Sequence, residues 1–347
     1  MQKIPVAIIN YNGKRTILNT IKSLYEMAGV EVDIHVFDDC STDGSPDLVR
    51  EKYPEVKLHI QPKNNGKLNI MRNIAIRKME GEIMLLTDND ILFDKKCLSE
   101  LLKVMESDPA ISICTPRLMF WDEPERVYYS DVKMHYIGAA IGDDRGKIVK
   151  TFGKEPVPNS GGGIMLLNRV RALEVGAFDE EFFLGFGDDG EFYQRMLRAG
   201  YKTFHVPGAF AYHEDKPFSE MRSYRAIAQI YNRWSFILSH YSIATILLLI
   251  PAFVVYEIML FGFMLMKRLP LMYFKSNFLI FKDLPLIYKK RKQIQRMRTV
   301  SDKGVLYSGS MYIAPSLLAG NAILRFFSNL LSGFFNVYWK LVKPLIP

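Results

Sequence analysis

Hydrophobic positions along residues 5–213 alternate between two spacings. Short, continuous apolar runs predict buried strands at residues 6–9, 32–37, 56–60, 83–87, 111–115, 164–167 and 201–206. Between them, helical spacing predicts helices at residues 16–27, 46–53, 68–79 and 98–105, and one that opens at 188 and stops at Gly200. Ser45 is expected to cap the second helix, with Pro46 at its first position. This order predicts an α/β domain with a mainly parallel mixed sheet, which binds ligands at the carboxyl ends of its strands.

Acidic side chains follow two of these predicted strands. Asp38 and Asp39 follow the strand at 32–37, and Asp88 and Asp90 follow the strand at 83–87. Both pairs are expected at the same edge of the sheet, where carboxylates suit Mg²⁺ or Mn²⁺, although helix capping would also place acids there. Neither G-x-G-x-x-G nor the P-loop pattern occurs, which excludes those two phosphate cradles.

Two features in the second half of this domain are also candidates for a site. Residues 161–163 are three glycines before a strand, which permit either close approach to a ligand or a tight turn. Asp188, Asp189 and Glu191 stand in the first turn of a predicted helix, where the helix dipole also favours acids. A functional role and a purely structural one both remain open for these acids.

Charge is divided unevenly along the chain. Residues 1–241 carry 31 Lys and Arg against 34 Asp and Glu, whereas residues 242–347 carry 14 against 3. A basic, aromatic-rich tail suits an anionic membrane surface better than nucleic acid, for which no known binding motif is present. Nucleic-acid binding through the tail would predict salt-sensitive binding to RNA or DNA but not to liposomes. Cys40, Cys97 and Cys114 have no metal-type spacing and are expected to be small buried thiols in a reducing compartment. The N-terminal apolar run is too short for the core of a signal peptide, so we expect the front domain in the cytoplasm.

Two apolar segments in the tail raise the question of a membrane span. Residues 242–266 are long enough to cross ~30 Å of hydrocarbon, but they contain Pro251 and Glu257. The basic residues that follow favour the cytoplasmic side, where the front domain is also expected, and a single span would separate the two. We therefore expect 242–266 to re-enter or lie on the membrane and 314–338 to be amphipathic; two true spans or a soluble helical core are the alternatives. The predicted division is a domain at 1–225 and a helical, membrane-associated region at 226–347.

Six segments, in order and in rough spacing, resemble the family 2 glycosyltransferases. They are VAIINYNG near the start, FDDCSTDGS at 37–45, NNGKLNIMRNIAI at 64–76, TDND at 87–90, GAFDEEFF at 176–183, and GDDGEFYQRMLRAGY followed by His213. The resemblance covers residues 5–213 and implies a GT-A fold, a nucleotide-sugar donor, a divalent cation (Mn²⁺ or Mg²⁺) and an inverting transfer.

The resemblance also implies roles for individual residues. Asp38 would bind the base of the donor and Arg72 the base or phosphates, while Asp90 would hold the cation. Asp88 would contact the ribose or a metal-bound water, and His213 the metal or the diphosphate. The other residues that we assign to nucleotide-sugar binding are Asn10, Tyr11, Asp39, Gly66, Lys67, Asn89 and Gly162.

The general base that the resemblance implies is Asp189, which would take the proton of the acceptor hydroxyl. Related members often have Glu-Asp, one residue, then Asp, whereas this chain has Asp188-Asp189-Gly190-Glu191. The charge is kept but the reach of the first and last acids differs, so Asp188 stays an alternative base and Glu191 a further catalytic candidate.

The resulting functional hypothesis is transfer of a sugar (hexosyl or deoxyhexosyl) to a lipid-linked glycan at the cytoplasmic membrane face, in cell-surface polysaccharide or glycoconjugate synthesis. Transfer to polyprenyl phosphate is a close alternative. A non-catalytic membrane scaffold would show a broken D-x-D or a missing base, and both are intact here. The sugar, the nucleotide and the linkage depend on the pocket around residues 118–163.

Overall fold

The computed structural model describes residues 3–142, 144–148, 153, 155–182, 187–214, 222–309 and 322–347. The chain forms two compact units. The first consists of Met1–Asp131, Asp144–Leu184 and Tyr201–Pro217, and the second of Val132–Asp143, Gly185–Gly200 and Phe218–Pro347. The second unit therefore takes in two segments that come before residue 225. The predicted functional division at that residue stays a prediction.

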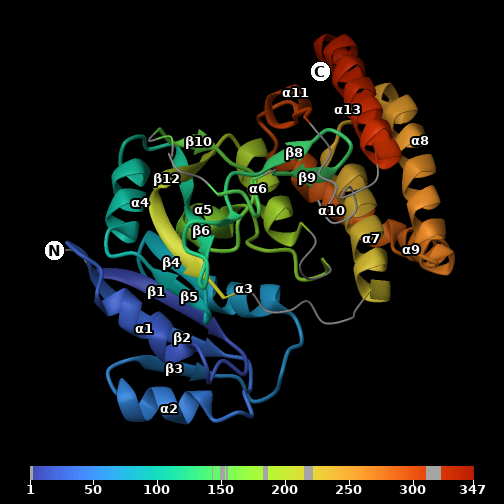
Figure 1. Cartoon of the computed structure of the whole chain (residues 1–347). Helices are drawn as coiled ribbons and strands as arrows, with labels where there is room; N and C mark the ends of the chain where they lie inside the picture. Colours follow the sequence, from blue (N-terminus) through green and yellow to red (C-terminus); the bar gives the residue numbers. More distant parts are fainter. Residues whose placement is uncertain are drawn as a thin grey trace. The chain divides into compact units, whose positions relative to one another are not determined.

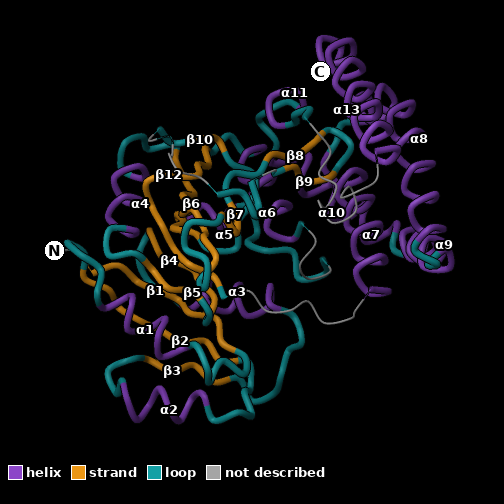
Figure 2. The backbone as a smooth tube through the Cα atoms, viewed as in Figure 1, coloured by secondary structure: helices purple, strands orange, loops and turns teal. Residues whose placement is uncertain are grey.

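The first unit is built on one mixed sheet (Figures 1 and 2). Its order is β10-β12-β6-β11-β4-β1-β2-β3, with β5 paired to β12 and β7 to β6. The strands are β1 (Lys3–Asn10), β2 (Glu31–Asp38), β3 (Lys57–Ile60), β4 (Ile83–Asp88), β5 (Ile91–Phe93), β6 (Ile111–Phe120), β7 (Val127–Tyr129), β10 (Val157–Pro158), β11 (Met165–Asn168) and β12 (Lys202–His213). β1 is parallel to β2 and β4, and β3 to β2, whereas β11 runs antiparallel to both of its neighbours. The predicted mixed, mainly parallel sheet is confirmed.

Helices cover both faces of this sheet (Figure 1). Successive strand residues point to opposite faces, and Val6 and Ile8 of β1 belong to a core cluster with side chains of α1 (Ile17–Tyr25), α2 (Ser45–Lys52) and α4 (Cys97–Met105). On the other face, α3 (Leu68–Lys78) packs on β1, β2 and α5 (Arg169–Glu174). Cys97 and Cys114 are buried as expected, whereas Cys40 is only half-buried, and all three are free thiols. Burial raises the pKa of Cys114 to about 12.

Several local predictions differ from the structure. Ser45 is not the cap of α2: Gly44, at φ 81°, holds that position, and the Ser45 hydroxyl instead accepts a hydrogen bond from Asn10. The strand predicted at 201–206 extends further, to His213, as β12, with a register shift between Val206 and Phe210. β5 and α5 were not predicted because three and six residues are too short to establish a periodicity.

The second unit is mainly helical, as expected for the tail. Its helices are α6 (Asp188–Arg198), α7 (Arg222–His240), α8 (Ile243–Met266), α9 (Pro270–Lys282), α10 (Leu284–Met297), α11 (Asp302–Val305), α13 (Ala322–Val342) and the 3-10 helix η1 (Lys343–Leu345), beside the hairpin β8 (Lys133–His135) and β9 (Ala139–Ile141). α9 packs on α7 and α8, α10 on α7, and α13 on α8.

The two predicted apolar segments have different outcomes. α8 coincides with 242–266, and within the described residues it is the one helix whose length and composition would allow it to cross a membrane. Ser242 caps α8 by accepting a hydrogen bond from the Thr245 amide. Of the second segment, residues 314–321 lie outside the described part of the chain, and the remainder belongs to α13.

Candidate nucleotide-sugar site

Asp38 and Asn10 end two neighbouring parallel strands of the first unit. They are register partners, and both are fully buried. Asn10 donates a hydrogen bond from Nδ2 to Asp38 Oδ2 (2.5 Å), and Ser41 donates to the same carboxylate from its amide (2.8 Å) and its hydroxyl (2.6 Å). These contacts fix the Asp38 carboxylate at the carboxyl edge of the sheet. Tyr11, the next residue after β1, is 53% exposed.

Asn10 also connects this acid to the D-x-D turn. Its Oδ1 accepts a hydrogen bond from Asn89 Nδ2 (2.6 Å), while the Asn89 carbonyl accepts one from the Thr20 hydroxyl (2.9 Å). Asn89 is the central residue of the turn between β4 and β5. The two acid-bearing strand ends are therefore joined through one buried amide, as the topology of the sheet predicted.

Asp39 fixes the loop that leads into α3. Its Oδ1 accepts hydrogen bonds from the Asn65 amide (2.9 Å) and Nδ2 (2.6 Å). Gly66 follows with φ 69°, a left-handed conformation that favours glycine. Lys67 caps α3 and donates from Nζ to the Glu180 carbonyl (2.8 Å). The predicted residues Asp39, Gly66 and Lys67 thus form a connected loop at the same edge.

Arg72 lies in α3 with only 4% of its side chain exposed. Its Nη2 lies 3.8 Å from Asp88 Oδ2, and its guanidinium carbon lies 5.1 Å from the centre of the Phe178 ring. A Cβ added at Gly163 would come within 3.0 Å of Arg72 Nη2, so a glycine there lets the backbone approach the guanidinium. The neighbouring Gly162 has φ 133°. A buried guanidinium beside the sheet edge has the planar donor set that binds phosphate or a base edge.

Side chains of α3 hold the segment around Phe178, and Asn73 makes two of these contacts, both with Phe178 itself. Asn73 donates from Nδ2 to the Phe178 carbonyl and accepts from the Phe178 amide through Oδ1, both at 2.8 Å. Sequence reasoning singled out the Arg72-Asn73 pair and the GAFDEEFF segment separately. It did not connect them, because contacts between residues 105 positions apart leave no periodic signal.

Asp90 and His213 meet where β5 pairs with the end of β12. His213 is the register partner of Ile91, and its Nε2 lies 3.8 Å from Asp90 Oδ1. The imidazole stacks on Tyr128, with 4.3 Å between ring centres and 12° between planes. Tyr128 was not predicted as a site residue, since one aromatic residue in a loop-rich stretch carries no specific signal. The structure does bring His213 to the D-x-D turn.

The chemistry of these side chains fits a divalent cation in part. A carboxylate oxygen and an imidazole nitrogen are donors that Mn²⁺ accepts. Among the described residues, however, no three His, Cys, Asp or Glu side chains converge closely enough to hold a metal ion by themselves. A cation at Asp90 and His213 would therefore depend on oxygens of the diphosphate or of water for the rest of its coordination.

The three acids of the predicted catalytic segment begin α6, in the second unit. Gly187 caps the helix at φ 90°, Asp188 is 5% exposed and Asp189 is half-buried. Glu191 differs, because Arg195 donates to both of its oxygens (2.8 and 2.7 Å) and His240 Nε2 lies 3.3 Å from Oε1. Burial alone would raise the pKa of Glu191, but the charge of Arg195 and the hydrogen bonds from His240 and Arg195 lower it to about 2. Its oxygens are occupied by two basic side chains.

Solved structures establish the class of fold. Mannosyltransferase PcManGT from Pyrobaculum calidifontis, in complex with GDP-Man and Mn²⁺, aligns with a TM-score of 0.52 and 16% identity over 98% of this chain and 86% of that one. GalNAc-T7 with UDP, GalNAc and Mn²⁺ aligns with a TM-score of 0.53 and 16% identity over 70% and 48%. The protein has the GT-A glycosyltransferase fold, followed by a helical C-terminal region, as predicted.

Sequence comparison establishes the family. Residues 6–169 match the family model described as Glycosyl transferase family 2, and this part of the chain belongs to that family. TarS of Staphylococcus aureus, a poly(ribitol-phosphate) beta-N-acetylglucosaminyltransferase, is 30% identical over 104 residues, 29% of this chain and 18% of that protein. Chondroitin synthase of Escherichia coli is 22% identical over 249 residues, 64% and 36% of the two chains. This chain thus spans well under half the length of both relatives.

Proposed function

We propose that the protein is an inverting glycosyltransferase that moves a hexosyl or deoxyhexosyl group from a nucleotide-sugar to a lipid-linked glycan, in cell-surface polysaccharide or glycoconjugate synthesis. The observation that carries this proposal is the convergence in the first unit of Asp38, Arg72, Asp88, Asp90 and His213 at one sheet edge. The names of two relatives, TarS and chondroitin synthase, support a polymer as the acceptor or product.

Donor binding is assigned to the buried polar groups of that edge. The Asp38 carboxylate, held by Asn10 and Ser41, would accept from a base N–H. The Arg72 guanidinium would bind phosphate oxygens, because its fork matches a pair of anionic acceptors. Asp88 would receive the ribose or a metal-bound water, and Tyr11, Asp39, Gly66, Lys67, Asn89 and Gly162 would shape the surrounding surface.

A divalent cation, Mn²⁺ or Mg²⁺, would be held by Asp90 and His213, with Asp88 close by on the same turn. When bound, it would neutralise the charge that builds up on the departing diphosphate. Asp90 and His213 have the donor types for this role, and the remaining coordination is left for the diphosphate and water.

Asp189 is the proposed general base. One of its carboxylate oxygens would take the proton of the acceptor hydroxyl. At the same time the hydroxyl oxygen of the acceptor would bond to the anomeric carbon, and the bond from that carbon to the nucleoside diphosphate would break. A single displacement inverts the anomeric centre. Asp188 remains the alternative base, while the pairing of Glu191 with Arg195 and His240 supports a structural role for Glu191.

The C-terminal region is proposed to hold the enzyme on the cytoplasmic face of a membrane. Its support is the apolar length of α8 together with the excess of Lys and Arg after residue 242. Membrane attachment brings the active site to a lipid-linked acceptor. Transfer directly to polyprenyl phosphate is the second candidate, and a lipid phosphate assayed beside a lipid-linked saccharide separates the two.

A panel of UDP-, GDP- and dTDP-sugars tests the proposal directly. The full chain in detergent, with Mn²⁺ present, is expected to hydrolyse or transfer from at least one donor, and Asp90→Asn is expected to lower that activity strongly at the same Mn²⁺ concentration. Asp47→Asn, in an exposed pair with Arg50 on α2, is the matched control. Absence of turnover and of binding with every donor would leave a non-catalytic scaffold as the better description.

A further inference from the structure

α8 exposes a continuous apolar stripe along one side. The stripe comprises Ile243, Leu247, Ile250, Val254, Ile258 and Leu265, which are 46–69% exposed. Their spacing of three, four and seven residues keeps them on one face of a helix. Thr245, Leu249 and Ala252, on the other side, are fully buried. α8 therefore has one side packed in the second unit and one side with no covering among the described residues.

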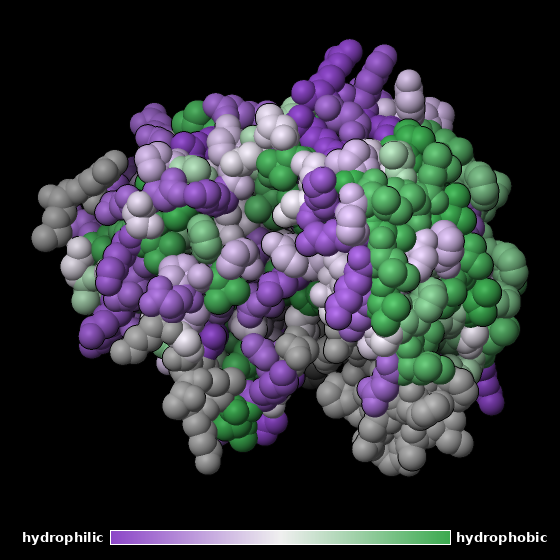
Figure 3. Space-filling view, turned by 90° about the horizontal axis from the view of Figure 1, so that it is seen from above, coloured by the Kyte–Doolittle hydropathy of each residue, from purple (hydrophilic) through white to green (hydrophobic). Residues whose placement is uncertain are grey.

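The two helices that pack against α8 have stripes of the same kind. On α9 the exposed residues are Leu271, Phe274, Phe278 and Phe281, and on α13 they are Leu330, Phe334, Val337 and Leu341. Figure 3 shows a broad apolar area on the side of the second unit that these helices occupy in Figure 1. We call the three stripes together the insertion face. An apolar patch of this extent on a soluble surface marks an interaction site.

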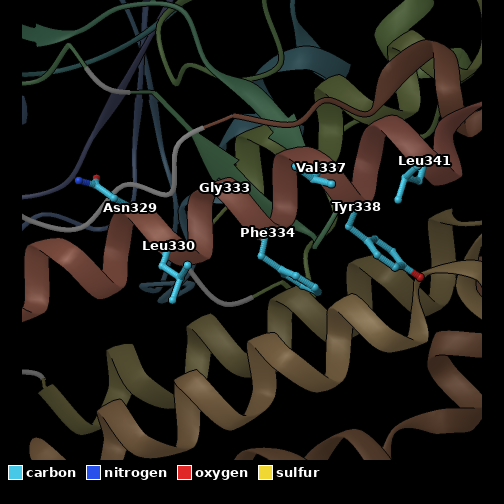
Figure 4. A pocket seen from close by; sticks show the side chains of 7 residues that line it. All are labelled: Asn329, Leu330, Gly333, Phe334, Val337, Tyr338 and Leu341. Carbon is cyan, nitrogen blue, oxygen red and sulfur yellow. The ribbon is translucent and has the colours of Figure 1, made fainter.

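A shallow apolar groove of about 490 Å³ runs along α13 within this face (Figure 4). It is lined by Asn329, Leu330, Gly333, Phe334, Val337, Tyr338 and Leu341. The Tyr338 hydroxyl, the main polar group in it apart from Asn329, donates to the Leu248 carbonyl of α8 (2.6 Å). A side chain added at Gly333 would meet no atom within 4 Å. The groove is thus shallow, open and apolar, which suits a hydrocarbon chain.

The charges of residues 242–347 indicate which kind of partner covers the insertion face. Residues 242–347 contain three acids, and each is bound within the second unit: Glu257 accepts from Arg233 and Tyr273, Asp283 accepts from Tyr231, and Asp302 is fully buried against Arg198. Among the described residues of this stretch, the exposed charges are basic: Lys267, Arg268, Lys275, Lys282, Lys289, Lys292, Arg296, Lys303, Lys340 and Lys343. A second copy of the chain would bring like charges together, whereas anionic headgroups complement them.

The lengths of the helices indicate how this face meets a bilayer. α9 has 13 residues, about 20 Å at 1.5 Å per residue, which is too short to cross the hydrocarbon core. Its apolar stripe is bordered by Lys275 and Lys282, which need headgroups or water beside them. α8 shares this surface, and its inner side carries the Glu257 contacts at mid-helix. α9 is thus suited to lie along a membrane surface, and the same exposed apolar surface continues onto α8.

We infer that the insertion face enters a single leaflet of an anionic bilayer, with α8 parallel to the membrane plane. This inference rests on the proposed membrane attachment and adds its geometry: which residues contact acyl chains, and that no helix crosses. The groove on α13 would then open into the leaflet, where the hydrocarbon tail of a lipid acceptor is found.

Depth measurements test the geometry. A fluorophore is attached at Leu247→Cys, Val254→Cys or Leu265→Cys in a Cys40→Ser background, since Cys97 and Cys114 are buried. The full chain is bound to phosphatidylglycerol–phosphatidylcholine vesicles with brominated acyl chains. Similar, shallow quenching at all three positions, and none at Lys303→Cys on α11, is the expected result. Deepest quenching at position 254, with 247 and 265 near opposite surfaces, would mean a span and overturn the inference.

Binding measurements test the occupant. Phe278→Glu is expected to weaken vesicle binding about tenfold or more, because it removes apolar contact and adds a charge that anionic lipid repels. Val170→Glu, on the exposed surface of α5 in the first unit, is the matched control and should bind as the parent does. A detergent-free dimer that binds no vesicles would show that a second copy covers the face. Donor hydrolysis measured in detergent reports separately on the proposed chemistry, so the two proposals fail independently.

Discussion

Arg198 and Asp302 form an ion pair in which neither side chain is exposed, although they are 104 positions apart in the chain. The other carboxylate oxygen, Asp302 Oδ2, accepts hydrogen bonds from the Ser242 amide (2.8 Å) and the Thr245 hydroxyl (2.6 Å). Asp302 thus joins the end of α6 to the beginning of α8. Arg198 lies in the last of the six matching segments, but Asp302 lies outside all of them, so no motif predicts this contact.

Replacing Asp302 should destabilise the second unit strongly. Asp302→Ala leaves the Arg198 guanidinium buried without its carboxylate, which typically costs about 3–5 kcal/mol. Chemical denaturation of the full chain measures this loss. The matched control is Asp108→Ala, whose partner Lys202 is 54% exposed and whose loss should cost about 1 kcal/mol or less. Equal effects of the two substitutions would contradict the structural role of the buried pair.

Arg72 is expected to govern donor affinity. Arg72→Lys keeps the charge but loses the planar fork. A charge-assisted hydrogen bond of about 1.5–3 kcal/mol corresponds to a roughly 10- to 150-fold weaker donor KM or Kd. Binding of the nucleoside diphosphate by calorimetry is the measurement. Arg77→Lys, further along the same helix and paired with exposed Glu180, should leave binding unchanged. Unaltered affinity in Arg72→Lys would place the phosphates elsewhere.

Asp189→Asn is expected to abolish transfer while donor binding survives. Loss of a positioned base usually lowers a rate by about 10²–10⁴-fold, whereas an amide of the same size keeps the local packing. Single-turnover transfer and calorimetric donor binding are measured on the same preparation. Turnover retained in Asp189→Asn but lost in Asp188→Asn would move the base to Asp188.

Glu191 should affect stability at low pH. Because its pKa is lowered from 4.5 to about 2, Glu191 contributes stability that is present above its unfolded pKa and is lost as pH falls toward 2. Glu191→Gln should therefore destabilise the protein most at neutral pH and progressively less between about pH 4.5 and 2. Denaturation at pH 7, 4 and 3 checks this trend. A destabilisation that does not change with pH would assign the effect to packing.

Metal dependence gives a separate test of Asp90. If Asp90 and His213 hold the cation, Asp90→Asn should raise the Mn²⁺ concentration needed for half-maximal activity by about tenfold or more. Titration of Mn²⁺ against donor hydrolysis measures this, with Asp47→Asn as the control. An unchanged Mn²⁺ requirement in Asp90→Asn would remove this residue from the proposed site.

The alternation of strands and helices was predictable because strands and helices have different hydrophobic periods. The meeting of Asp38 and Asp88 at one edge was predictable because the carboxyl ends of parallel strands lie at the same edge of a sheet. The pairing of Glu191 with His240 was not, since it joins residues whose sequence neighbourhoods are unrelated. The exposed face of α8 was not predictable either, because the residues of α8 are apolar on all sides. Only the packing of Leu249 and Ala252 shows that Ile250 and Val254 face outward.

The contacts of Asp302 with Arg198, Ser242 and Thr245 determine which fragments of this protein can be prepared. A fragment ending at residue 225 would separate Arg198 from Asp302, which leaves the buried guanidinium without its carboxylate. It would also remove His240 from Glu191, which keeps Arg195 as its partner. Removing the apolar C-terminal region to obtain a soluble catalytic fragment would therefore destabilise α6, the helix that begins with Asp188 and Asp189. Detergent or nanodisc preparations of the intact polypeptide are the appropriate starting material.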